Sequence, residues 1–143
     1  MPRRKVLYAT LPRMGAEMKT SELIGPALDW AVMKIEGRVL VQTLGGGLLV
    51  NGRHEDGREL PEDWQMTFMW HPSTDWEQGG PIIERESMTL TPFDDKWEAR
   101  CKSDIPLAVK FIERRGPTPL IAAMRCFVAS KLGDEVEIPE ELK

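Results

Sequence analysis

The chain has 143 residues, of which 41% are hydrophobic and 29% are charged, as is typical of a single globular domain. No apolar run approaches the roughly 20 residues that span a bilayer, and the N-terminus lacks the hydrophobic stretch of a secretory signal. We therefore expect a cytoplasmic protein without a membrane partner. Residues 1–17 hold four basic residues and one acidic residue, so the rest has 15 basic and 22 acidic residues and a net charge of −7. Such a body repels phosphate backbones, which disfavours general nucleic-acid binding.

The beginning of the chain predicts an extension followed by a helix. Residues 1–17 contain prolines and a glycine and show no helical or strand periodicity, which indicates a flexible N-terminal extension. A helical pattern then runs over residues 18–37, with a cap at Thr20 or Ser21. A Gly-Pro pair interrupts its first turns, so either the regular helix begins near Pro26 or the helix is kinked early.

Strand patterns follow this helix. Two β-rich runs, residues 38–43 and 48–51, flank Gly45-Gly46-Gly47 and predict a hairpin. Residues 51–62 are polar, contain two turn signals and predict a loop. Residues 64–70 alternate between large apolar residues and their neighbours, which predicts a strand with one face on the core.

The middle of the chain predicts two helical turns and a second hairpin. Thr74 and Glu77 have the spacing of a capping box, and Gly79-Gly80-Pro81 ends one turn and starts another. Residues 88–91 and 97–102 then flank a polar turn, as the strands of a hairpin do.

Two helices and an acidic tail complete the pattern. Residues 106–115 have apolar residues at helical spacing and predict a short amphipathic helix. The clearest helix has Thr118 as its cap, Pro119 at its first position and Gly133 at its end. Its apolar face comprises Leu120, Ile121, Met124, Phe127, Val128 and Leu132. Three apolar residues can anchor the tail: Val136, Ile138 and Leu142. The whole pattern predicts an α+β fold, in which a small antiparallel sheet of two hairpins plus the strand ending at Trp70 packs against two main helices and short helical turns.

Five separate strings stand out: Lys19–Leu23, Ala27–Val32, Ser73–Trp76, Gly79–Glu84 and Gly116–Arg125. In content and order they resemble the NinX-like family of lambdoid phage and prophage proteins, a domain of unknown function. The resemblance implies a single domain over residues 18–143, a phage origin and an accessory role in early or intermediate gene expression. It carries no activity, catalytic residue or cofactor.

The resemblance begins at Met18, which predicts that residues 1–17 do not belong to the natural product. Gly15-Ala16 can be encoded with a GGAG ribosome-binding sequence shortly before the Met18 codon. We therefore expect Met18 to be the native start, and the intact mass of the protein made during infection would test this expectation.

Most groups with chemical potential have simpler structural interpretations. Gly45-Gly46-Gly47 lacks the Lys-Ser/Thr of a phosphate-binding loop, so we interpret it as a hairpin tip. His54 and His71 are the only histidines, and their spacing does not demand a metal site. Cys101 and Cys126 are too few for a zinc or disulfide framework, and we expect buried thiols.

Two charged groups also have a simpler interpretation than chemistry. Asp94 and Asp95 faintly resemble the acidic pair of a metal-dependent nuclease, but turn aspartates explain them better. Arg114, Arg115 and Arg125 can form a small basic patch for an anion, although solvated charges are the more common outcome.

The strongest candidate contact surface is an aromatic segment with a capped turn and two glycines. It comprises Trp70, His71, Ser73, Thr74, Asp75, Trp76, Gly79 and Gly80. One interpretation is a pocket or surface for a host or phage protein, which makes the chain a non-enzymatic interaction domain. A purely structural interpretation is that both tryptophans fill the core while Thr74 and Glu77 only cap. A third is a small enzyme or ligand-binding domain that uses His71 and Asp75 on a nucleotide or nucleic acid. The sequence predicts no catalytic residue, metal or cofactor.

Overall fold

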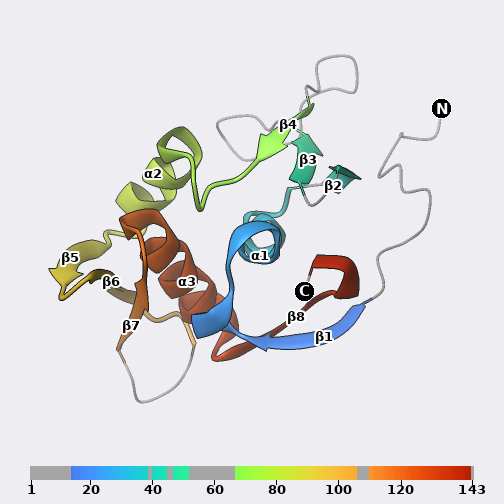
Figure 1. Cartoon of the computed structure of the whole chain (residues 1–143). Coiled ribbons are helices and arrows are strands. Elements are labelled where there is room, and N and C mark those ends of the chain that lie inside the picture. Colours follow the sequence, from blue (N-terminus) through green and yellow to red (C-terminus); the bar gives the residue numbers. More distant parts are fainter. Residues whose placement is uncertain (1–13, 39, 45–46, 52–66, 106–109, 143) are drawn as a thin grey trace.

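The computed structural model describes residues 14–38, 40–44, 47–51, 67–105 and 110–142 (Figure 1). Within these residues, three α-helices and three small antiparallel sheets confirm the predicted α+β class. The two predicted hairpins belong to different sheets, and the N- and C-terminal parts of the described chain form the third.

Helix α3 (Pro119–Leu132) lies at the centre of the fold, between the β5–β7 sheet and helix α1 in Figure 1. The Oγ1 atom of Thr118 accepts a hydrogen bond from the Ile121 amide at 3.1 Å, which confirms the predicted cap. The helix is buried on nearly all sides, as expected of an apolar helix inside a core. Leu132 is an exception to the predicted apolar face, because it is the last helical residue and 38% exposed.

Helix α1 (Gly25–Glu36) begins at the Gly-Pro pair, so the unkinked alternative is confirmed. A separate 3-10 turn, η1 (Thr20–Glu22), precedes it, and Ile24 between them has an extended backbone. The helix ends at Gly37, whose φ of 69° lies in the left-handed region that favours glycine.

The predicted first hairpin and the following strand form one sheet, in which β3 (Gly47–Asn51) lies between β2 (Leu40–Leu44) and β4 (Thr67–Trp70). Leu48 of β3 faces Trp70 of β4 in the register, and both are buried. The predicted hairpin tip at Gly45-Gly46, the loop, His54 and residues 64–66 lie outside the described residues.

The second predicted hairpin is confirmed as β5 (Thr89–Phe93) and β6 (Lys96–Lys102), and β6 also pairs with β7 (Phe111–Gly116) on its other side. A helix was predicted over residues 106–115, but residues 111–115 belong to strand β7. The prediction was therefore wrong there. Every residue of β7 pairs with β6, and the inner face of the sheet packs on α3. The helical spacing of a few apolar residues was outweighed by this ladder and its packing. Residues 106–109 lie outside the described part of the chain.

The third sheet corrects the prediction that all of residues 1–17 are flexible. Strand β1 (Met14–Lys19) pairs with β8 (Glu135–Pro139), a strand that the sequence did not predict. Gly15 has a φ of 138°, and the register shifts between residues 14 and 16, which hides the period-two pattern of β1. The three predicted tail anchors are all buried, the last in η3 (Glu140–Leu142). Residues 1–13 lie outside the description.

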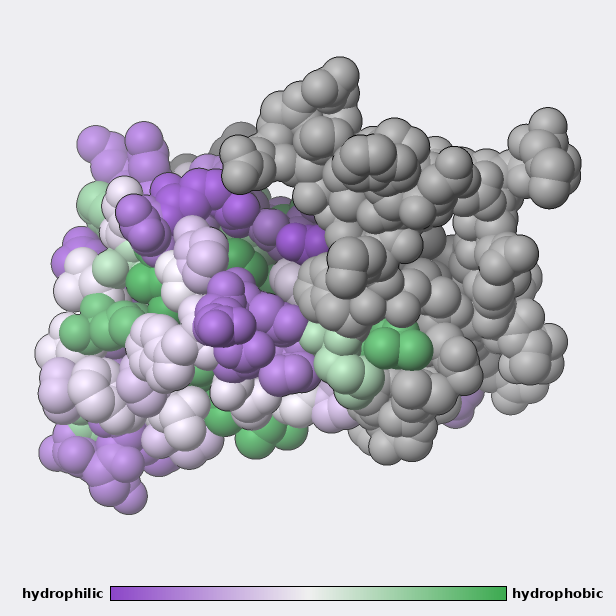
Figure 2. Space-filling model, turned by 90° about the horizontal axis from the view of Figure 1, so that it is seen from above, coloured by the Kyte–Doolittle hydropathy of each residue, from purple (hydrophilic) through white to green (hydrophobic). Residues whose placement is uncertain are grey.

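Helix α2 (Trp76–Arg85) replaces the two predicted helical turns. Pro81 lies inside this helix rather than at the start of a second one, although a proline there removes a backbone hydrogen bond and crowds the preceding turn. Figure 2 shows polar and apolar residues interspersed on the described part of one face. Among the helices that the structure describes, none is long and apolar enough to cross a membrane.

Candidate functional site

The Trp70–Gly80 segment begins in the core. Trp70, the last residue of β4, is 3% exposed, and its Nε1 atom donates a hydrogen bond to the backbone carbonyl of Asp29 at 2.8 Å. The indole therefore joins β4 to α1. The interpretation that both tryptophans fill the core is correct for Trp70.

Asp29 is the residue of this region that the sequence analysis missed. It lies in the buried stretch of α1, is 4% exposed, and accepts a hydrogen bond from the Ser73 amide at 2.9 Å. Burial raises the pKa of the Asp29 carboxyl to about 6, against the opposing effect of the Ser73 amide. A lone carboxylate within an apolar helical stretch was the available signal. The hydrogen bond between Asp29 and Ser73 joins two of the strings that carry the family resemblance, Ala27–Val32 and Ser73–Trp76.

The start of α2 is fixed by two polar side chains. Asp75, not Thr74, is the N-cap, because its Oδ1 atom accepts from the Glu77 amide at 2.9 Å. The Gln78 amide group spans the turn, since Nε2 donates to the Met69 carbonyl at 2.6 Å and Oε1 accepts from the His71 amide at 2.7 Å. These bonds hold the helix start against the end of β4.

The two glycines of the segment have different surroundings. A Cβ atom on Gly79 would lie 2.5 Å from the Pro72 carbonyl oxygen and 2.7 Å from Cδ2 of Leu120, so α2 approaches both its preceding loop and α3 closely. A Cβ atom on Gly80 would meet nothing within 4 Å. Only Gly79 is required by packing.

Trp76 differs from Trp70 because its side chain is 54% exposed at the first position of α2. Thr74, two residues before it, and Glu77, directly after it, are also exposed. We call Thr74, Asp75, Trp76 and Glu77 the Trp76 surface. The structural interpretation, in which both tryptophans fill the core, was therefore wrong for Trp76.

The enzymatic alternative gains no support from the geometry of His71 and Asp75. The His71 Nδ1 atom lies 4.0 Å from Oδ2 of Asp75, beyond hydrogen-bond distance, and both side chains are partly exposed. Neither residue lines the two cavities described below. Within the described residues, no three histidine, cysteine, aspartate or glutamate side chains gather as metal ligands do.

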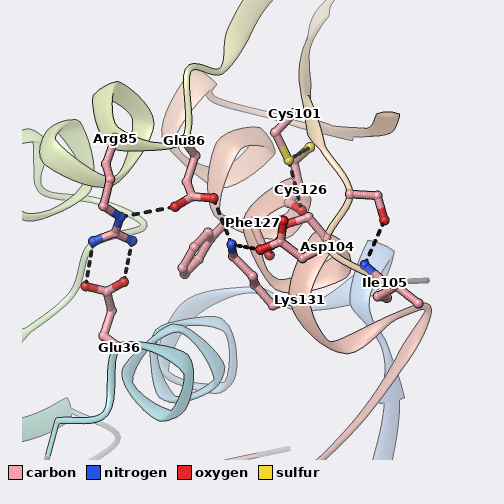
Figure 3. Close-up of polar contacts among 11 residues, drawn as sticks. Glu36, Arg85, Glu86, Cys101, Asp104, Ile105, Cys126, Phe127 and Lys131 are labelled. Carbon is pink, nitrogen blue, oxygen red and sulfur yellow. Dashed lines mark hydrogen bonds and ion pairs between the residues drawn. The ribbon is translucent and has the colours of Figure 1, made fainter. Parts of the chain in front are cut away.

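A network of ion pairs joins the C-terminal ends of the three helices (Figure 3). Arg85 of α2 binds Glu36 of α1 through two contacts, at 3.2 and 2.5 Å, and Glu86 at 3.1 Å. Lys131 of α3 joins Glu86, at 3.0 Å, to Asp104 after β6. A cavity of about 570 Å³ beside this network is lined in part by Arg85, Glu86 and Asp104. The charges of the network are largely paired with one another, which is typical of structural cross-links.

The two cysteines are buried, as predicted, but the sequence did not predict that they touch. Cys101 of β6 and Cys126 of α3 are free thiols whose Sγ atoms lie 3.0 Å apart (Figure 3). This contact lowers the pKa of Cys101 and raises that of Cys126. Cys126 also donates to the Ile112 carbonyl at 3.2 Å. Their place between sheet and helix is that of packed core residues.

The acidic residues of the second hairpin are not gathered into a nuclease-like group. Asp94 has a φ of 54° in the turn between β5 and β6, as predicted for a turn aspartate. Glu98 forms an ion pair with Arg115 at 3.1 Å, and Arg100 lies 3.7 Å from Glu113.

Comparison with known families adds the relationship that geometry alone does not give. The family model described as bacteriophage P22 NinX matches residues 19–131, which is most of the chain. The chain belongs to the NinX family. The match includes η1, the three helices and the β2–β4 and β5–β7 sheets, and the resemblance noted in the sequence is confirmed. A search among curated proteins gives no match. NinX membership identifies a phage-associated protein and assigns no site, so the segment from Trp70 to Gly80 stays a prediction.

Proposed function

We propose that this NinX protein is a non-enzymatic interaction domain that binds a host or phage protein through the Trp76 surface, in the cytoplasm of an infected bacterium. The observation that carries the proposal is the exposure of Trp76, at 54%, on a helix start held by the cap of Asp75 and the two bonds of Gln78. Tryptophan is enriched among residues that dominate binding energy. A fixed backbone lowers the entropy cost of using it.

The charges beside Trp76 indicate the kind of partner. Asp75 and Glu77 precede and follow Trp76 in the chain, and the chain has a net charge of −4. Complementarity therefore favours a partner that offers an apolar pocket for the indole with lysine or arginine at its rim. A nucleic acid fits this acidic surface poorly.

Site-specific crosslinking during infection tests the proposal. A photo-crosslinking amino acid at Thr74, which is exposed beside Trp76, captures whatever covers this surface. We expect one protein to be crosslinked, and we expect Trp76→Ala to reduce its yield at least tenfold. The control is Phe111→Ala, which removes a similarly exposed aromatic, 48% exposed, from strand β7.

The variants should remain folded, because truncating an exposed side chain removes little core packing. Crosslinking that persists in Trp76→Ala would exclude the indole as the contact. Equal loss in both variants, or capture of nucleic acid instead of protein, would also contradict the proposal.

A further inference from the structure

A second cavity, of about 490 Å³, lies where strand β7 turns into α3 and where η1 approaches. Four basic residues line it: Lys96, Arg114, Arg115 and Arg125. The lining also includes the Ser21 hydroxyl and two glutamates, Glu98 and Glu113. The lining is therefore net positive in an acidic chain. The three arginines of the basic patch considered in the sequence therefore line one cavity.

Arg125 is a lining residue that two backbone carbonyls hold in place. Its Nε atom donates to the Leu23 carbonyl at 2.7 Å, and Nη1 donates to the Arg115 carbonyl at 2.9 Å. Among the residues that the structure describes, no carboxylate lies within ion-pair distance of its guanidinium. Burial lowers the pKa of Arg125, which shows that its charge is partly removed from water. A partly desolvated cation with only neutral partners is stabilised by a bound anion.

The other charges of the cavity do not neutralise Arg125. Glu98 is paired with Arg115 at 3.1 Å, and Glu113 lies 3.7 Å from Arg100. Arg114 is paired with Asp134 at 2.6 Å, but its Nε atom is buried and has no hydrogen-bond partner within the described residues. Lys96 forms no ion pair in that part of the chain, so two cations of the lining lack a counter-ion.

We propose that this cavity binds a phosphoryl oxyanion through Arg125, Lys96 and the hydroxyl of Ser21. The guanidinium of Arg125, the ammonium of Lys96 and the hydroxyl of Ser21 supply N–H and O–H donors that suit the oxygens of phosphate, while the two lining glutamates lie close to other arginines. The volume is larger than a single phosphate needs and lies in the range of small-molecule sites. Free phosphate and the phosphate of a nucleotide share this chemistry.

The test must separate anion binding from the structural role of Arg125, which joins α3 to β7 and to the residues before α1 through its two carbonyl contacts. Lys96 serves this purpose, because it is exposed and its replacement should leave the fold intact. Its matched control is Lys102, at the other end of β6. A strand rises about 3.3 Å per residue, so Lys102 lies about 20 Å from Lys96.

The experiment is a titration of the full chain with inorganic phosphate and with AMP at constant ionic strength, followed by amide chemical shifts. We expect saturable shifts around residues 114–117 and 125. Lys96→Glu should weaken phosphate binding at least tenfold, whereas Lys102→Glu should change it less than twofold. Ser21→Ala should weaken binding about threefold without a change in unfolding midpoint.

The AMP arm separates the two sources of the phosphoryl group. Tighter binding of AMP than of phosphate supports a nucleotide ligand, and equal binding supports the free anion. No saturable shift up to 20 mM phosphate would overturn the proposal. Equal weakening by Lys96→Glu and Lys102→Glu would also overturn it, because it would show general charge attraction instead of a site.

Discussion

At the scale of single residues, Gly79 and Gly80 are adjacent in α2 but should respond differently to alanine. Gly79→Ala places a methyl group against backbone and Leu120 at 2.5 to 2.7 Å, so we expect a loss of about 1 to 3 kcal/mol in unfolding free energy. Gly80→Ala meets no residue outside its chain neighbours within 4 Å, but its Cβ atom crowds the ring of Pro81, so the helix-propensity gain is offset and we expect a change below about 1 kcal/mol. Urea unfolding of both variants measures the difference, and equal effects would show that α2 does not approach its neighbours as closely as described.

Asp29 should make stability depend on pH. Its pKa is about 6 in the fold against 3.8 as the ordinary value, so the folded state binds a proton more readily than the unfolded state. Its contribution to stability is therefore fully present below about pH 3.8 and is lost as the pH rises through about 6. The loss is on the order of 3 kcal/mol at 1.36 kcal/mol per pKa unit.

The matched variant is Asp29→Asn, which keeps an oxygen acceptor for the Ser73 amide and cannot ionise. We expect the variant to gain stability relative to the wild type as the pH is raised from 4 to 7. Urea unfolding of the two proteins at each pH gives this difference. Parallel stability curves would contradict the assignment of the raised pKa to Asp29.

At the scale of elements, the sequence proposes Thr74 as the cap of α2 and Thr118 as the cap of α3, and of these two only Thr118 has that role. Thr118→Ala should cost about 1 kcal/mol, since it removes the acceptor of the Ile121 amide at the start of the central helix. Thr74→Ala should cost only a few tenths, because Asp75 caps α2 instead. Thermal unfolding distinguishes these outcomes. A larger effect at Thr74 would show that Thr74 is the cap of α2, as the capping-box spacing predicted.

The predictability of each element follows from where its stabilising contacts lie. Helices α1 and α3 and the two hairpins were predictable because Gly37, Pro119 and the turn residues act on their own neighbourhood. Strands β7 and β8 were not, since β7 is fixed by β6 and α3, and β8 by β1 at the far end of the chain. A local pattern cannot reveal a partner that is more than a hundred residues away.

The candidate sites were predictable to a similar degree. The exposed tryptophan and the arginines were visible as residue types, but the sequence could not say that Trp70 is buried and Trp76 exposed. Nor could it show that Arg125 shares a cavity with Lys96, since they come from different elements. Burial and convergence are tertiary properties, and they decide which charged or aromatic residue is available to a ligand.

At the scale of the whole molecule, the buried cysteines report on global opening. Cys101 is 2% exposed and Cys126 is fully buried between β6 and α3, so a thiol reagent should reach them only when sheet and helix separate. We expect no thiol to react in the native protein within minutes and both to react in 6 M urea. Labelling rates should rise with urea in parallel with the unfolded fraction. Rapid modification of either cysteine without urea would contradict the described core.

The pairing of β1 with β8 has a consequence for the order of events during synthesis. The Asp134 carbonyl accepts from the Thr20 amide at 2.8 Å, and the paired strands beside it come from opposite ends of the described chain. At translation rates of 5 to 20 residues per second, β1 precedes β8 by roughly 6 to 24 seconds. The helices and hairpins can form in that interval, so the edge of β1 waits unpaired while they assemble. These two strands can therefore pair only after the elements between them have been synthesised.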